Sequence, residues 1–212
     1  IGILELLNDM PVEGVYVSAM EAVDVQMQEQ LQEIVEKNQI SLYTMKHGDM
    51  IRSEAFGEMK CLFPIYVDQT AESENERSLV LRYVYGDTSV LFTGDLEAKQ
   101  ESLLERNNLI EETDILKVSH HGSKTASTES FLQALTPETA VISCGTNNLY
   151  GHPHQEVLER LSACGAEILR TDEMGSVVVD IPPEGTAEVT AAAERKPIYE
   201  RIKEAMEGTP IP

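Results

Sequence analysis

The stretch SVLFTGDLEAKQESLLERNNLIEETDILKVSHHG, residues 89–122, decides how this chain folds. It contains two short apolar runs, Val90–Phe92 and Ile115–Val118, separated by a segment whose leucines recur at helical spacing. Apolar runs of this length predict buried strands, and the spacing between them predicts a helix. We therefore expect a strand, a helix and a second strand, which is the repeating unit of an α/β protein.

Polar side chains follow both predicted strands. Asp95 comes just after the first strand, and His120 and His121 come just after the second. Because the carboxyl ends of adjacent parallel strands meet in one crevice, we expect the carboxylate and the imidazoles to lie together and to form a metal site. A second interpretation stays open at this point: Asp95 is also a good helix N-cap, and Gly122 with Ser123 forms a good turn.

A resemblance to a known family rests on four segments that follow one another in this order. They are LFTGD (residues 91–95), LKVSHHGS (116–123), NLYGHPHQEVLERL (148–161) and ILRTDEMGSVVVD (168–180). Together they resemble the metallo-β-lactamase-fold domain of ComEC-type competence proteins and their free-standing relatives. The resemblance implies an α/β fold of the αββα sandwich type. It also implies a metal-dependent hydrolase of phosphodiester or related ester bonds that uses a metal-activated water.

The chain of 212 residues is long enough for one sizeable core. We expect residues 1–181 to form the metallo-β-lactamase-like domain and residues 182–212 to form a linker and a C-terminal helical tail. In the family, an HxHxDH-type ligand motif runs straight into a helix that resembles residues 1–7. This chain lacks that motif, so we expect a domain that is incomplete at its N-terminus. The alternative is a relative that never had the motif.

Hydrophobic periodicity predicts further elements outside residues 89–122. Helices are expected over residues 23–38, 127–135 and 153–163, and strands over residues 15–17, 41–45, 59–64, 139–143, 168–169 and 177–179. Gly86 and Asp87 lie between two alternating runs and predict a hairpin.

The resemblance also implies roles for the residues at the two strand ends. A carboxylate that bridges two divalent cations holds them about 3.5–4 Å apart, which suits the displacement of an ester oxygen. Asp95 is expected to take this role, and Gly94 allows the backbone to turn sharply beside it. His121 directly precedes a glycine, as the family's last metal-binding histidine does, so it is expected to be a metal ligand. His120 is expected to contact the substrate phosphate or the leaving oxygen and, with Asp95, to be catalytic.

Four further residues are expected to bind the substrate: His152, Asn75, Ser123 and Tyr150. Pro153 suits the first position of a helix, and the free amides of a first helical turn form an anion site beside His152. Asn75 lies where the ComEC-like branch has an Asn followed by a Ser instead of a histidine. For the residues around the helix start, an ordinary solvated surface is the alternative.

The net charge limits the expected partners. With 37 acidic and 16 basic residues, the formal charge is −21, which repels long nucleic acids and anionic membranes. The expected substrate is therefore a small anionic ester held by metal ions. The resemblance implies two divalent ions, both zinc or zinc with manganese, whose other ligands lie in the absent motif. No apolar run is long enough to cross a bilayer.

Two other functions are compatible with the sequence. A serine nucleophile is the weaker alternative, because no GxSxG elbow occurs. The second alternative is a non-catalytic binding or assembly module that keeps the fold without the first ligand motif. The 3 cysteines show no CxxC spacing and leave the compartment undecided, and no pattern indicates the oligomeric state.

Overall fold

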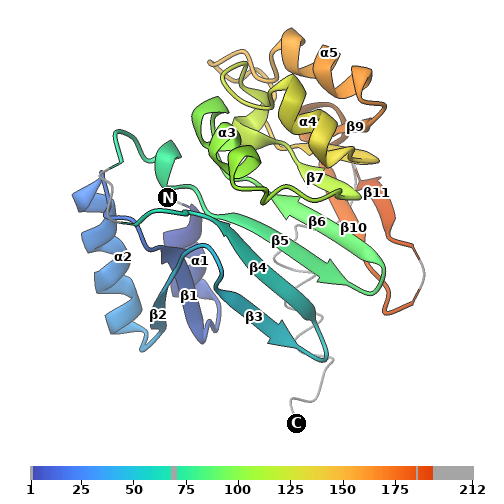
Figure 1. The fold of residues 1–212 in the computed structure, drawn as a ribbon. Helices are drawn as coiled ribbons and strands as arrows, with labels where there is room; N and C mark the ends of the chain where they lie inside the picture. The colour runs from blue at the N-terminus through green and yellow to red at the C-terminus, as the bar shows by residue number, and fades with distance from the viewer. Residues whose placement is uncertain (1, 68–70, 185, 193–212) are drawn as a thin grey trace.

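The computed structural model describes residues 2–67, 71–184 and 186–192. Its main element is a seven-stranded mixed sheet with the strand order β3-β4-β5-β6-β7-β8-β9 (Figure 1). These strands are β3 (Met50–Ser53), β4 (Gly57–Phe63), β5 (Val80–Tyr85), β6 (Thr88–Phe92), β7 (Ile115–Lys117), β8 (Thr139–Ile142) and β9 (Glu167–Arg170). The pairings from β3 to β6 are antiparallel, and those from β6 to β9 are parallel. The carboxyl ends of β6 to β9 therefore lie at the same end of the sheet.

The unit predicted from residues 89–122 is present. β6 leads into α3 (Ala98–Arg106), and α3 returns the chain to β7, which pairs with β6 in parallel. Leu96, Leu104 and Leu116 are fully buried in this unit. Burial of a leucine contributes about 1.5–3 kcal/mol, so these contacts fix the helix on the sheet. The α/β class expected from the sequence is confirmed.

Three helices cover the parallel half of the sheet (Figure 1). They are α3, α4 (Glu129–Leu135) and α5 (Gln155–Ala163). Phe131 of α4 and Leu161 of α5 are fully buried in one core with Ile142 of β8. This packing holds the strand ends in fixed positions, and the candidate site lies at these ends.

A smaller layer is built from the N-terminal part of the chain. β1 (Gly14–Ser18) and β2 (Ser41–Met45) form a separate two-stranded parallel sheet beside α1 (Gly2–Asp9) and α2 (Val25–Lys37). Its core consists of Leu7, Val15, Val35 and Ile40. The helix predicted over residues 23–38 is thus confirmed as α2.

Two short 3₁₀ helices approach the carboxyl ends of the central strands. η1 (Asn75–Arg77) precedes β5, and η2 (Ser119–Gly122) directly follows β7. η2 contains the histidine pair, so the chain has already left the sheet at these residues.

The structure contains elements that the sequence patterns did not predict. β3 forms a hairpin with β4, and the short helix α6 (Thr171–Met174) follows β9 directly. β10 (Ser176–Asp180) pairs with β11 (Glu188–Ala192), so part of the segment expected as a linker is a strand. The expected helical tail falls mostly in residues 193–212, outside the described residues. Among the described helices, none is long and apolar enough to cross a membrane.

Candidate functional site

The residues expected to form a site meet at the carboxyl ends of β6 and β7. His121 Nε2 lies 3.4 Å from Asp95 Oδ1. The two side chains are 47% and 40% exposed, so this pair opens to solvent. The expected closeness of Asp95 to the histidine pair is confirmed, and the chemical roles of these residues are taken up below as a proposal.

The turn after β6 positions Asp95. Gly94 has a φ of +56°, and a Cβ atom there would lie 3.0 Å from the Ser78 side chain. Asp95 N donates a hydrogen bond to Ser78 Oγ at 3.0 Å, and His120 N donates one to Gly94 O at 3.0 Å. A glycine is therefore needed at position 94, as expected. The N-cap of α3 is Glu97, so the interpretation of Asp95 as a helix cap is wrong.

His120 and His121 adopt a left-handed backbone conformation in η2. Their φ and ψ angles are 46° and 43° for His120 and 55° and 22° for His121. In an extended strand, two successive side chains would point to opposite faces. The left-handed turn instead lets both rings approach acidic side chains of the segment after β6. Such angles cost about 1–2 kcal/mol per non-glycine residue, and this kind of strain clusters at functional sites.

The tautomer of His121 follows from its hydrogen bond to the strand beside it. His121 Nδ1 lies 2.7 Å from Ser143 O, just after β8. Because a carbonyl oxygen only accepts, Nδ1 carries a proton, and in the neutral ring the lone pair is then on Nε2. Metal-binding histidines commonly donate their other ring N–H to a carbonyl in this way. In its neutral form, His121 therefore presents to Asp95 a nitrogen whose lone pair can bind a metal ion.

Glu97 is a site residue that the sequence analysis missed. Its Oε1 lies 3.4 Å from His120 Nδ1 and accepts a hydrogen bond from Thr125 Oγ1 at 3.0 Å. His120 Nδ1 is buried and has no hydrogen-bond partner among the described residues. Glu97 comes two positions after Asp95, in the same short connection between β6 and α3. That spacing was the available sequence signal.

His152 joins the histidine pair from the loop before α5. Its ring centroid lies 5.7 Å from that of His120 and 6.4 Å from that of His121. Tyr150 stacks on His152 with a centroid separation of 5.7 Å. Burial, and then the neighbouring histidines, lower the pKa of His152, which favours its neutral form. We refer to Asp95, His120, His121 and His152 as the histidine–aspartate cluster.

Close packing between two loops brings His152 into this cluster. A Cβ atom on Gly122 would lie 2.6 Å from Pro153 Cβ, so the loop before α5 rests directly on the histidine turn. Asn148 fixes the same loop. Its side chain donates to His152 O at 2.6 Å and accepts from His152 N at 2.9 Å.

The expectation that Pro153 opens the helix is wrong. α5 begins at Gln155, and His154 is its N-cap. Two tertiary contacts hold Pro153 in the loop: its packing on Gly122, and the hydrogen bond from His154 N to Gly122 O.

A half-buried lysine lies at the same strand end as the cluster. Lys117, the last residue of β7, donates a hydrogen bond to Val118 O at 2.9 Å. Burial lowers the pKa of the Lys117 ammonium, and the negative charge of Asp95 partly opposes this shift. Lys117 pairs with Phe92, which comes shortly before Asp95 in the chain, so its amino group belongs to the same strand end as the cluster. A lysine inside an apolar strand run was the sequence signal for this residue.

The remaining predicted substrate residues lie around the cluster. Tyr150 is 79% exposed and reaches the cluster through His152. Ser123 is buried, and its hydroxyl bonds with Thr125 Oγ1 at 3.0 Å. Asn75 lies in η1, where its carbonyl accepts a hydrogen bond from Ser78 N at 3.1 Å. Among the residues that the structure describes, no hydrogen bond or ion pair joins the Asn75 side chain to the cluster.

Residues 123–128, the 123–128 loop, follow the histidine turn and are held by side chains of two helices. Glu101 of α3 is fully buried and accepts hydrogen bonds from Ser127 N at 2.6 Å and Thr128 N at 2.9 Å. Arg160 of α5 donates to Ala126 O at 3.0 Å and Ser127 O at 2.6 Å. Burial raises the pKa of Glu101, and the bonds from Thr128 and Ser127 oppose this rise. The loop therefore has a defined backbone course.

Asp95 and His121 fit part of a divalent metal site. They offer an oxygen and a nitrogen donor, and the hydrogen bond of His121 to Ser143 leaves Nε2 free for coordination. Within the described ranges, no group of three or more His, Cys, Asp or Glu side chains is placed to hold one ion. A catalytic zinc usually takes three protein ligands, so these two residues supply only part of a complete site.

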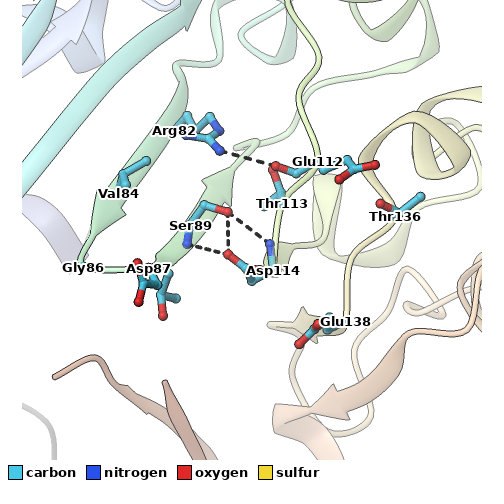
Figure 2. A pocket seen from close by; sticks show the side chains of 11 residues that line it. Arg82, Val84, Gly86, Asp87, Ser89, Glu112, Thr113, Asp114, Thr136 and Glu138 are labelled. Atoms are coloured by element: carbon cyan, nitrogen blue, oxygen red, sulfur yellow. Dashed lines mark hydrogen bonds between the residues drawn. The ribbon is translucent and has the colours of Figure 1, made fainter. Parts of the chain in front are cut away.

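A separate cavity of about 420 Å³ lies at the amino ends of the parallel strands. Figure 2 shows Ser89 bonded to Asp114, and Arg82 bonded to Glu112, on its wall. None of the residues expected in the site lines this cavity. The histidine–aspartate cluster is the candidate functional site, because its groups combine metal-binding atoms, strained backbone and exposure to solvent.

Part of the chain matches a known family. Residues 68–146 match the model of the metallo-beta-lactamase superfamily. The matched segment contains Asp95 and the pair His120 and His121.

Three known proteins are similar to this chain. It is 40% identical over 140 residues to ComE operon protein 3 of Bacillus subtilis (strain 168), and 43% identical over 105 residues to competence protein ComA of Neisseria gonorrhoeae. It is 35% identical over 130 residues to recombination protein 2 of Haemophilus influenzae. These alignments cover 65%, 49% and 61% of this chain, but 17%, 15% and 16% of the respective relatives. The chain thus spans a small part of the length of the curated relatives it matches.

Proposed function

We propose that this domain is part of a metal-dependent hydrolase, because the chain has a metallo-β-lactamase fold and is related to the ComEC-type competence proteins. The bonds that it cleaves would be phosphodiester or related ester bonds, as the resemblance implies.

The pairing of His121 with Asp95 is the observation that carries this proposal. The two side chains lie 3.4 Å apart, and His121 Nδ1 is bound to Ser143 O, so Nε2 and the carboxylate can serve one ion. A divalent ion, if bound there, would supply a water nucleophile at neutral pH and would offset the negative charge of the ester. Asp95 and His121 would hold the ion, and Lys117 would offset the remaining charge of the carboxylate.

Further ligands are needed, since two protein ligands are fewer than a catalytic zinc usually takes. We place them outside the described residues, in keeping with the HxHxDH motif that the resemblance implies. Zinc is the expected ion, and manganese is the alternative. Asp95 and His121 would then supply part of the ligands of the centre.

We assign to His120 the role of delivering a proton to the leaving oxygen. Its Nδ1 faces Glu97 Oε1 at 3.4 Å, so Nε2 is the nitrogen that can face the substrate. A carboxylate at one ring nitrogen fixes the orientation of the ring. His120 Nε2 can therefore donate its proton as the ester oxygen departs.

A small anionic ester is the substrate that the charges favour. Lys117 lies at the same strand end as Asp95, and Lys124 extends from the exposed part of the 123–128 loop, so positive charge is local to the cluster. The chain as a whole carries a formal charge of −21. A short ester would meet mainly the local charge and the metal ions, whereas a long nucleic acid would also meet the acidic surface.

The test is metal-dependent hydrolysis of bis(4-nitrophenyl) phosphate by the full gene product. Asp95→Ala is expected to lower kcat/KM by about 100-fold or more, because even residues that only support a metal ligand change activity by about 10–100-fold. Asp87→Ala is the matched control. It removes an exposed aspartate from the hairpin between β5 and β6 and is expected to leave the rate unchanged. Equal rates for Asp95→Ala and the wild type would reject the proposal.

A non-catalytic binding or assembly module is the competing function. It predicts that the full gene product shows no metal-dependent turnover. It also predicts that Asp95→Ala and His121→Ala leave zinc binding unchanged, which calorimetric titration of the full gene product would reveal.

A further inference from the structure

Arg170, Thr171 and Asp172 form a network away from the histidine–aspartate cluster, although they belong to one of the four segments that resemble the ComEC-type family. They lie where β9 ends and the chain enters α6. Arg170 binds Asp172 through Nε at 3.1 Å and through a second nitrogen at 2.6 Å. The Asp172 and Arg170 side chains are 14% and 23% exposed, so this two-point contact is largely shielded from water.

Thr171 continues the pairing of β8 and β9 with its side chain. The backbone pairing ends at Ile142 and Arg170. Beyond it, Thr171 Oγ1 accepts a hydrogen bond from Cys144 N at 2.9 Å and donates one to Cys144 O at 2.9 Å. A hydroxyl group can donate and accept at once, so it replaces the backbone partner that β9 no longer offers.

Asp172 also holds the segment that follows β8, through two further hydrogen bonds. Its carboxylate accepts a hydrogen bond from Cys144 Sγ at 3.1 Å, and its carbonyl accepts one from Thr146 Oγ1 at 3.2 Å. The chain after β8 is thus fixed to the start of α6 by side chains.

One peptide group links this network to the cluster. The carbonyl of Ser143 and the N–H of Cys144 belong to the same planar peptide unit. Thr171 Oγ1 accepts a hydrogen bond from the N–H of this unit, and His121 Nδ1 donates one to its carbonyl at 2.7 Å. Because the unit is rigid, a hydroxyl that fixes its N–H also fixes the direction of its carbonyl.

We propose that Thr171, supported by Arg170 and Asp172, is a positioning residue that keeps the ring proton of His121 on Nδ1. The proton stays there because Ser143 O remains aimed at Nδ1, and Nε2 therefore stays free to bind a cation. The value of this arrangement for metal binding rests on the proposed function. The position of the proton itself is a property of the chain without metal or substrate.

The test is the tautomer of His121, read from two-bond ¹H–¹⁵N correlation spectra of the chain labelled at histidine nitrogens. Spectra are recorded near pH 8, above the ordinary pKa of free imidazole side chains, about 6.5. His121 signals are identified by their loss in His121→Asn. In the wild type, His121 is expected to be mainly protonated on Nδ1. In Thr171→Val, the share protonated on Nδ1 is expected to fall at least about twofold, because the peptide group is no longer held.

Three variants make the result specific. Thr171→Ser keeps the hydroxyl and is expected to restore the wild-type spectrum. Thr88→Val makes the same change at a buried position at the start of β6 and is expected to leave His121 unchanged. Asp172→Asn is expected to shift His121 in the same direction as Thr171→Val. If Thr171→Val does not fold, Asp172→Asn decides, and an unchanged His121 spectrum in that variant overturns the proposal.

The outcomes separate this inference from the proposed function. A wild-type His121 protonated mainly on Nε2, or a Thr171→Val spectrum equal to the wild type, overturns the positioning role even if the full gene product is an active hydrolase. An inactive full gene product whose His121 responds to Thr171→Val rejects the hydrolase and supports the positioning role.

Discussion

Gly122 and Pro153 pack so closely that a Cβ atom on Gly122 would lie 2.6 Å from Pro153 Cβ. Gly122 also has a φ of +83°, a conformation that side chains with a Cβ rarely adopt. This contact and the hydrogen bond from His154 N to Gly122 O hold the loop that carries His152 against the turn that carries His120 and His121. A glycine at this position is therefore a condition for assembling the histidine–aspartate cluster.

Gly122→Ala is expected to reduce the free energy of unfolding by about 2–4 kcal/mol. About 1 kcal/mol would come from the left-handed backbone, and about 1–3 kcal/mol from overpacking against Pro153. Gly165→Ala is the matched control, because Gly165 has a φ of +85° but nothing within 4 Å of the added Cβ. It isolates the backbone contribution. Equal losses in the two variants, measured by urea unfolding, would show that the contact with Pro153 is not tight.

Zinc binding by this chain alone is expected to be weak. Structural sites with complete ligand sets bind zinc with about 10–16 kcal/mol, so roughly half a set suggests about 5–8 kcal/mol. This corresponds to a Kd of roughly 1–200 µM. Calorimetric titration should show this affinity in the wild type and its loss in His121→Ala. His47→Ala, in the turn between β2 and β3, should bind zinc as the wild type does. Nanomolar binding would mean that this chain supplies more ligands than Asp95 and His121.

Asp172→Asn is expected to destabilise the fold by about 1–2 kcal/mol at pH 7, because it removes a shielded bidentate contact with Arg170. Hydrogen bonds from Arg170 hold the pKa of Asp172 below the ordinary value of 3.8, although burial opposes this shift. A folded-state pKa below the unfolded one means that the unfolded state binds more protons. The stabilisation is therefore full above the unfolded pKa and is lost as the pH falls through the folded one.

Urea unfolding at several pH values checks this sign. The difference in stability between the wild type and Asp172→Asn should be constant near neutral pH and should shrink in acid below the ordinary pKa. Asp87→Asn, at an exposed position, should show no comparable difference. A difference that grows as the pH falls would contradict the shift.

Glu101→Gln is expected to cost about 1–3 kcal/mol, because the two carboxylate oxygens each accept a backbone N–H and an amide can supply only one acceptor there. Hydrogen exchange of the Ser127 and Thr128 amides should become faster than in the wild type. Glu105→Gln makes the same change one turn further along α3 and should leave these amides unaffected. Unchanged exchange in Glu101→Gln would mean that the carboxylate does not hold the 123–128 loop.

The α/β class and the meeting of Asp95 with the histidine pair could be predicted from residues 89–122. Both follow from short-range signals: apolar runs of strand length, leucines at helical spacing, and polar residues at strand ends. Once two strands are parallel neighbours, the residues after them are near each other without any further information. Gly94 was predictable for the same reason, since a sharp turn with a positive φ favours glycine.

Other features could not be predicted, because contacts between distant segments determine them. Pro153 suits a first helical position by propensity, but its packing on Gly122 places it in a loop. The left-handed angles of His120 and His121 have no local signal, and the hydrogen bond from His120 N to Gly94 O holds the chain there. The link from Thr171 to His121 passes through a peptide group of a third segment, so no spacing in the sequence reveals it.

The 123–128 loop is restrained on both sides of its backbone, since Glu101 accepts from its N–H groups and Arg160 donates to its carbonyl groups. Its conformational entropy is therefore already lost when the protein folds, at about 1–2 kcal/mol per residue. A ligand that docks beside this loop has little disorder left to remove there. The entropic penalty of binding is correspondingly smaller, and association does not have to wait for the loop to become ordered.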